Sequence, residues 1–106
     1  MSEYIPDGET RVESGVVLEE ELKEPSMYRV ILHNDDFTTM DFVVMVLMEI
    51  FRKSAEEAES IMLAVHEKGR GVCGVYPKEI AEFRVGQVLR RANEAGFPLL
   101  CTMEKE

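Results

Sequence analysis

The sequence predicts an α+β fold in which three helices pack on a three-stranded sheet, antiparallel or mixed, in the order β-α-α-β-α-β. The apolar run at 28–32 has the β-branched and aromatic content of a buried strand. From Met40 onward, apolar residues recur at three- and four-residue spacing, which is typical of one face of a helix. Two later apolar runs, 71–76 and 97–103, are typical of strands.

The first strand is expected at about 27–33 and the first helix at about 39–53. The helix would bury one face, made of Met40, Val43, Val44, Leu47, Ile50 and Phe51. A polar loop joins the two elements. Either Thr38 or Thr39 can cap the first helical amides, because threonine oxygens accept hydrogen bonds from them.

The second helix is expected at about 55–68. Ser54 and Glu57 have the spacing of a capping box, and Gly69 is suited to the position just past a helix end. The strand that follows, Gly71 to Tyr76, contains a glycine where a bulge or a close backbone approach is expected.

Pro77 is suited to the first turn of the third helix, which should end near Gly96. Its core-facing residues are predicted to be Ile80, Ala81, Val85, Val88, Leu89 and Ala92. The last strand is expected at Phe97 to Met103. No internal repeat interrupts this order.

The length and the charge distribution indicate one domain with an acidic extension. A chain of 106 residues with 45% hydrophobic content supports a single core. Of the net charge of −9, residues 1–25 carry −6, from eight acids and two bases. We therefore expect residues 1–25 to be disordered and residues 26–106 to form the domain. The acidic balance also argues against nucleic-acid binding.

Cysteine usage and hydropathy suggest a cytoplasmic protein. Cys73 and Cys101 lie in apolar runs without a Cys-x-x-Cys spacing, so we expect buried free thiols. A disulfide would require the two strands to be neighbours. No apolar stretch has the length of a membrane span, and the amino terminus lacks a signal-peptide pattern.

The polar loop His33-Asn34-Asp35-Asp36-Phe37-Thr38-Thr39 has several interpretations. Its residues are those that turns and caps prefer, so the loop can be purely structural. A metal site formed by His33, Asp35, Asp36 and His66 lacks a strong ligand spacing, and no nucleophile with a base is evident. An interaction domain without a binding pocket is a further alternative.

Five blocks in order show a resemblance to a known family. They are Leu32-His-Asn-Asp-Asp36; Met40 with Phe42-Val43; Met62-Leu-Ala-Val-His66; Gly71-Val-Cys-Gly-Val75; and Pro98-Leu-Leu-Cys-Thr102. Together they resemble the ClpS family, adaptors that bind proteins by their N-terminal residue and deliver them to the Clp protease. The resemblance covers roughly residues 25–104.

The resemblance implies a binding protein that is not an enzyme and has no cofactor or metal. The substrates would be proteins that begin with Leu, Phe, Tyr or Trp. The other partners would be the N-terminal domain of a ClpA-type AAA+ chaperone and its ClpP protease. A monomer is the simplest expectation.

The resemblance also assigns site residues. The terminal amine would be bound by Asn34, Asp35 and His66. The hydrophobic pocket would comprise Met40, Val43, Met62, Val65 and Leu99. Asp36 and Thr38 would contact the peptide backbone, and Glu79 and Arg84 the chaperone. Met40 would exclude side chains branched at the β-carbon. The chain departs from the family pattern at Phe37, Thr39, Asp41 and Arg84, where tyrosine, proline, glutamate and lysine are common.

Overall fold

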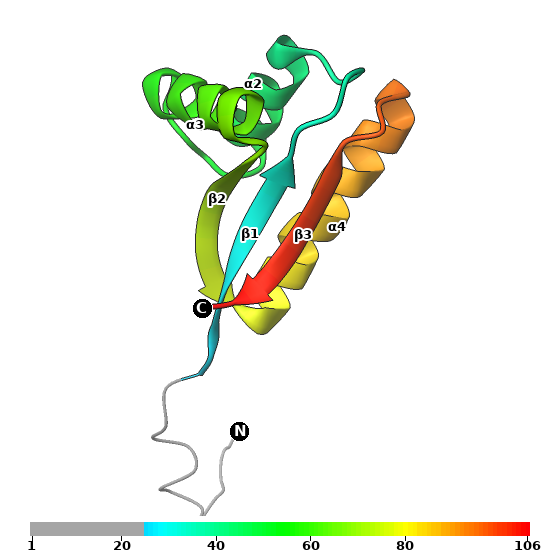
Figure 1. The fold of residues 1–106 in the computed structure, drawn as a ribbon. Coiled ribbons are helices and arrows are strands. Elements are labelled where there is room, and N and C mark those ends of the chain that lie inside the picture. The colour runs from blue at the N-terminus through cyan, green and yellow to red at the C-terminus, as the bar shows by residue number, and fades with distance from the viewer. Residues whose placement is uncertain (1–24) are drawn as a thin grey trace, which may run out of the picture.

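The computed structural model describes residues 25–106 and confirms the predicted order of elements (Figure 1). The prediction of disorder for residues 1–25 therefore falls, except for Pro25, outside the described residues. The elements are β1 (Met27–His33), α2 (Met40–Glu49), α3 (Ala55–Lys68), β2 (Arg70–Pro77), α4 (Lys78–Ala95) and β3 (Leu100–Lys105).

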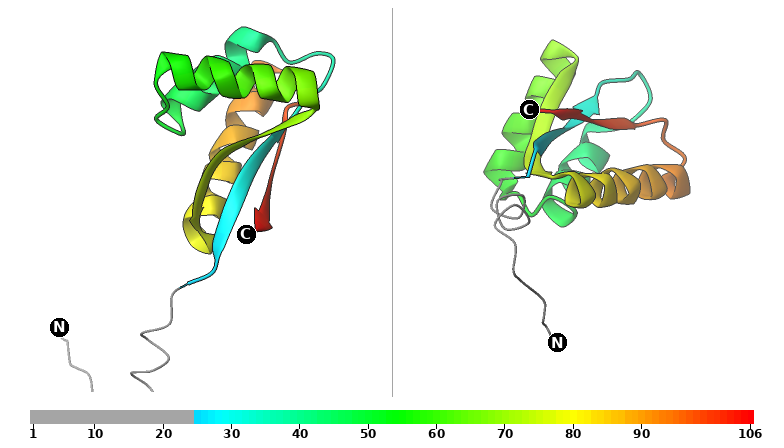
Figure 2. Two further views of the ribbon diagram at one scale, coloured as in Figure 1. Left: turned by 60° about the vertical axis from the view of Figure 1, so that its left-hand side comes forward. Right: turned by 90° about the horizontal axis from the view of Figure 1, so that it is seen from below.

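The sheet is antiparallel and has the strand order β2-β1-β3. Helix α4 lies along one face and contacts all three strands, whereas α2 and α3 pack on each other beyond the carboxyl end of β1 (Figures 1 and 2). The register between β1 and β2 shifts between Val30 and Ile31, which confirms the irregularity expected from the glycines of β2. The arrangement leaves the β1–α2 loop beside the end of α3.

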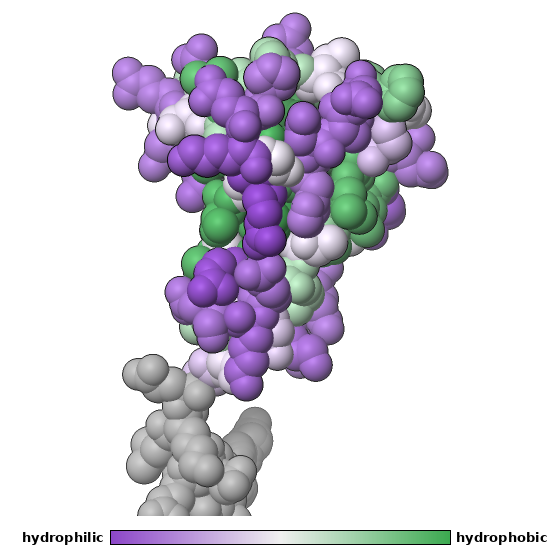
Figure 3. Space-filling model, in the orientation of Figure 1, coloured by the Kyte–Doolittle hydropathy of each residue, from purple (hydrophilic) through white to green (hydrophobic). Residues whose placement is uncertain are grey.

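Residues of β1 alternate between the two faces of the sheet. Val30 and Leu32 belong to the core under α4, together with the buried residues of α2 and α3. Ile31 points to the opposite face and is nevertheless fully buried. Within residues 25–106, no helix covers that face, and hydrophilic residues dominate it (Figure 3).

Polar contacts link the strands on this face. Glu104 of β3 pairs with Arg70 of β2 at 2.9 Å and with Arg29 of β1 at 3.7 Å. His33 Nε2 and Thr102 Oγ1 lie 2.8 Å apart. These exposed ion pairs contribute little to stability individually, but their side chains lie over the apolar middle of the sheet.

Both α2 and α3 begin at the side-chain caps that the sequence contains. Thr39, and not Thr38, caps α2: its hydroxyl oxygen accepts a hydrogen bond from the Phe42 amide at 3.1 Å. The capping box of α3 is confirmed, since Ser54 and Glu57 exchange hydrogen bonds of 3.0 and 3.1 Å.

Three predicted boundaries were wrong by a few residues. Helix α2 ends at Glu49 instead of about 53, because Arg52 adopts a left-handed backbone. Pro77 has an extended backbone and precedes α4, so it is not in the first turn. Strand β3 begins at Leu100 instead of Phe97, since Phe97 and Leu99 pack into the core before the strand pairs with β1.

Cys73 and Cys101 are free and buried. They lie on β2 and β3, which are separated by β1, so the two strands are not neighbours. Burial raises the pKa of the Cys101 thiol to about 12 and that of Cys73 further still. Both thiols therefore remain protonated and act as small core side chains. Within residues 25–106, no helix is long and apolar enough to cross a membrane.

Replacement of Arg52 by glycine should stabilise the protein. Arg52 has φ +57°, and the amide of Lys53 donates to the Leu47 carbonyl at 3.1 Å, which closes the end of α2. Glycine adopts this backbone without a steric penalty, although glycine loses more backbone entropy on folding than arginine does. We expect Arg52→Gly to raise the free energy of unfolding in urea by about 0.5–1 kcal/mol. Lys53→Gly is the control and should give no gain. An equal gain from both variants would contradict this explanation.

Candidate functional site

The site is built on the loop between β1 and α2. Its first residue, Asn34, is held to the end of α3 by a hydrogen bond of 2.9 Å from its amide to the Gly69 carbonyl. Gly71 lets β2 approach α3 closely, because a Cβ at this position would lie 2.8 Å from Val65 Cγ2. The loop and the last turns of α3 are therefore brought face to face.

Asp35 is bonded within the loop. Its Oδ1 accepts from the amides of Phe37 at 2.8 Å and Thr38 at 2.7 Å, and its Oδ2 accepts from the Thr38 hydroxyl at 2.7 Å. Desolvation raises the pKa of the Asp35 carboxyl, but these hydrogen bonds together outweigh it, and the pKa lies below its usual value. Asp35 is therefore ionised at neutral pH.

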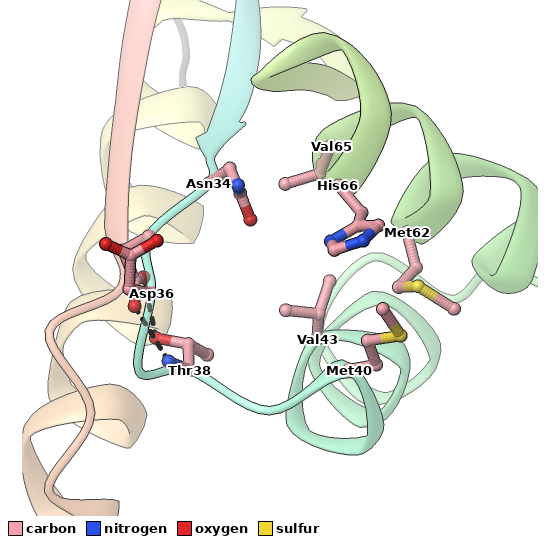
Figure 4. A pocket seen from close by; sticks show the side chains of 9 residues that line it. Asn34, Asp36, Thr38, Met40, Val43, Met62, Val65 and His66 are labelled. Atoms are coloured by element: carbon pink, nitrogen blue, oxygen red, sulfur yellow. Dashed lines mark hydrogen bonds between the residues drawn. The ribbon is translucent and has the colours of Figure 1, made fainter.

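A cavity of about 240 Å³ opens between this loop, α2 and α3 (Figure 4). The side chains of Asn34 and His66 are directed toward the same opening from opposite sides. The lining residues are Asn34, Asp35, Asp36 and Thr38 of the loop, Met40 and Val43 of α2, and Met62, Val65 and His66 of α3.

The cavity combines a polar side and an apolar side. Its apolar wall is mostly buried, with Val43 6%, Val65 3% and Met62 9% exposed. Met40, in contrast, is 45% exposed and lies at the mouth. Hydrogen-bond acceptors of the loop and of His66 thus lie beside an apolar wall. This combination suits an amphipathic ligand.

The structure brings together nine of the ten residues predicted for the amine, the pocket and the peptide backbone. The exception is Leu99, which is 4% exposed, belongs to the core and does not line the cavity. Its contact with a ligand stays a prediction. The hydrogen bonds from Thr38 to Asp35 were not anticipated, and the Asp-x-x-Thr spacing was the only signal for them.

Glu79 and Arg84 lie on α4, away from the cavity. Glu79, in the first turn of α4, lines a separate hollow of about 430 Å³ near the start of β1. Arg84 donates to Gln87 Oε1 at 3.0 Å, and its guanidinium carbon lies 5.8 Å from the centre of the Phe83 ring. Phe83 and Ile80 expose 58% and 43% of their surface on this helix, so the prediction that Ile80 faces the core was wrong.

The metal alternative finds no support in the part of the chain that the structure describes. No group of three or more His, Cys, Asp or Glu side chains gathers there in a way that could hold an ion. His33 bonds to Thr102 on the sheet, whereas His66 lines the cavity, so the two imidazoles do not share a site.

Comparison with known proteins identifies close relatives. Residues 23–102 match the family model described as ATP-dependent Clp protease adaptor protein ClpS. An ATP-dependent Clp protease adapter protein ClpS of Oleidesulfovibrio alaskensis is 65% identical over 96 residues, covering 91% of this chain and 92% of the relative. One from Nitratidesulfovibrio vulgaris is 54% identical over 101 residues, covering 95% and 99%.

A solved structure is similar in fold as well. Agrobacterium tumefaciens ClpS2 bound to L-phenylalaninamide has a TM-score of 0.76 and 38% sequence identity to this chain. The match covers 78% of this chain and all of the solved one.

Proposed function

The chain belongs to the ClpS family of ATP-dependent Clp protease adaptors, and we propose that its cavity binds the N-terminal residue of substrate proteins. As a member of that family it is an adaptor and not an enzyme. The observation that carries the proposal is the pairing of convergent acceptors with an apolar wall in one cavity. The ligand of the Agrobacterium relative, L-phenylalaninamide, has the matching chemistry: a free ammonium beside a benzyl group.

The polar side of the cavity would bind the terminal ammonium, which has three donors and no acceptor. On this proposal, the acceptors are the Asn34 carbonyl oxygen, the unprotonated ring nitrogen of His66, directly or through water, and a carboxylate of the loop, either Asp35 as predicted or Asp36 beside it. Asp36 and Thr38 are placed to meet the backbone that follows. Each hydrogen bond to a charged group contributes about 1.5–3 kcal/mol when well made.

The apolar side would take the first side chain. Met40, Val43, Met62 and Val65 surround this part of the cavity, and the flexible thioethers of the two methionines adapt to side chains of different shape. Leu, Phe, Tyr and Trp are the proposed first residues. Burial of such a side chain contributes roughly 1.5–3 kcal/mol.

The experiment that tests this function compares peptides that differ only in the order of their first two residues. A peptide beginning Phe-Gly should bind more tightly than one beginning Gly-Phe by about 10- to 100-fold, because only the first places the ring in the cavity. Fluorescence anisotropy with a label at the carboxyl end measures both. Composition, charge and length are matched, so equal affinities would refute recognition of the first residue.

Delivery to the protease requires a second surface. The proposed partners are the N-terminal domain of a ClpA-type chaperone and its ClpP protease, with Glu79 and Arg84 at the contact. In support, these residues lie on α4 beside exposed Ile80 and Phe83 and do not line the cavity. Substrate and chaperone can therefore be bound together. We further propose that residues 1–25 form an extension and residues 26–106 the adaptor domain. The protein would be a cytoplasmic monomer.

A further inference from the structure

We infer that Asp35 is a positioning residue, which acts on the ligand through the shape of the β1–α2 loop and not through its negative charge. This inference rests on the proposed binding of a terminal ammonium. It departs from the prediction that Asp35 is itself an ammonium acceptor. Thr38 acts together with Asp35, because its amide and hydroxyl donate two of the three hydrogen bonds that Asp35 accepts.

The hydrogen bonds that Asp35 accepts within the loop leave few of its acceptor sites free for a ligand. A carboxylate offers about four lone-pair sites. Three are used: Oδ1 accepts two amides, and Oδ2 accepts the Thr38 hydroxyl. This side chain closes the turn from Asp35 to Thr38, as aspartate does when it bonds to amides two and three residues ahead. An ammonium could approach only the one remaining site on Oδ2.

The neighbouring carboxylate, that of Asp36, differs from Asp35 in its hydrogen bonding. Among the described residues, the Asp36 carboxylate receives no hydrogen bond, although it also lines the cavity. The pKa of Asp35 is lowered by its loop bonds, in spite of the desolvation that raises it. The negative charge of Asp35 is thus already stabilised inside the loop. Asp36 keeps its acceptors available.

The loop needs such a closure because it carries several lining residues. Asn34 precedes Asp35, while Asp36 and Thr38 follow it, and all three line the cavity. Outside the closure, the loop backbone is held by the Asn34–Gly69 hydrogen bond at one end and the Thr39 cap at the other. Loss of the Asp35 bonds would free the segment between these ends, and side chains that must converge on one ligand atom would lose their alignment.

Asparagine separates shape from charge at this position. Its amide oxygen can accept from the Phe37 and Thr38 amides as Oδ1 does, and its amino group can donate to the Thr38 hydroxyl oxygen. Asp35→Asn therefore retains all three hydrogen bonds with the last one reversed, but it removes the charge. Asp35→Ala removes both. Thr38→Val removes only the hydroxyl, and Thr38→Ser keeps it.

The test measures the affinity of a Leu-starting peptide for the full chain and these four variants by fluorescence anisotropy. We expect Asp35→Asn and Thr38→Ser to stay within about threefold of the parent, and Asp35→Ala to lose at least about tenfold. Thr38→Val should fall between them. Asp36→Asn is the matched control for charge, and it should weaken binding although Asp35→Asn does not.

Two results would overturn the inference. If Asp35→Asn binds as poorly as Asp35→Ala, the charge of Asp35 contacts the ammonium. If Asp35→Ala and Thr38→Val bind as tightly as the parent, the closure has no role. Thermal unfolding of each variant identifies any loss of fold, and the comparison of Asp35→Asn with the parent still decides whether the charge of Asp35 matters if Asp35→Ala unfolds. Failure of the parent to bind would refute the proposed function itself.

Discussion

Acetylation of the terminal amine is expected to abolish the binding of a peptide that begins with leucine or phenylalanine. The modification removes the positive charge and two of the three donors, while Asn34, His66 and the loop carboxylate keep their unpaired acceptors inside the cavity. Each hydrogen bond to a charged group is worth about 1.5–3 kcal/mol, so the loss of two predicts an affinity at least about 100-fold lower. Calorimetry with the free and acetylated peptides measures the difference.

The control is the same peptide acetylated on a lysine side chain near its carboxyl end. This change removes the same charge from the peptide as a whole but leaves the terminal ammonium intact. It should bind as the unmodified peptide does. If terminal acetylation leaves affinity unchanged, the cavity would be a general apolar pocket, and capture of the amine would be refuted even if the first side chain still mattered.

The parts of the fold that were predicted correctly depend on local patterns. The capping box of Ser54 and Glu57 involves residues three positions apart, and the structure contains both of its hydrogen bonds. The premature end of α2 was missed because apolar spacing continues through Ile50 and Phe51, both of which are buried. The left-handed backbone at Arg52 follows the helix end, and no glycine at this position indicates it in the sequence.

The site was less accessible to sequence reasoning. Residues 34–43 and 62–66 meet because α2 and α3 pack on each other beyond the end of β1, and no spacing in the chain encodes that meeting. The family resemblance supplied it. Even so, the resemblance could not show that Asp35 is bonded to its own loop. Nor could hydropathy distinguish Leu99, which packs in the core, from the buried Val43 and Val65, which also line the cavity.

The two cavity methionines should respond differently to truncation. Met62 is 9% exposed, and Met62→Ala should cost about 2–3 kcal/mol of stability, near the lower end for buried methionine. Met40 is 45% exposed at the mouth, so Met40→Ala should cost less than about 1 kcal/mol. Met48→Ala, on the same helix, 40% exposed and away from the cavity lining, is the matched control.

Met40→Ala should also admit peptides that begin with valine or isoleucine. A thioether at the mouth of the cavity occupies space that a β-branched side chain needs, and alanine vacates it while Val43 and Val65 still form the wall behind. The Ile-to-Leu affinity ratio, measured by anisotropy on the parent and the variant, should rise by about tenfold, as expected for newly permitted burial of a branched side chain. Met48→Ala should leave the ratio unchanged. If Met40→Ala destabilises the protein by several kcal/mol and leaves the ratio at the parental value, Met40 is a core residue and the exclusion of β-branched side chains has another source.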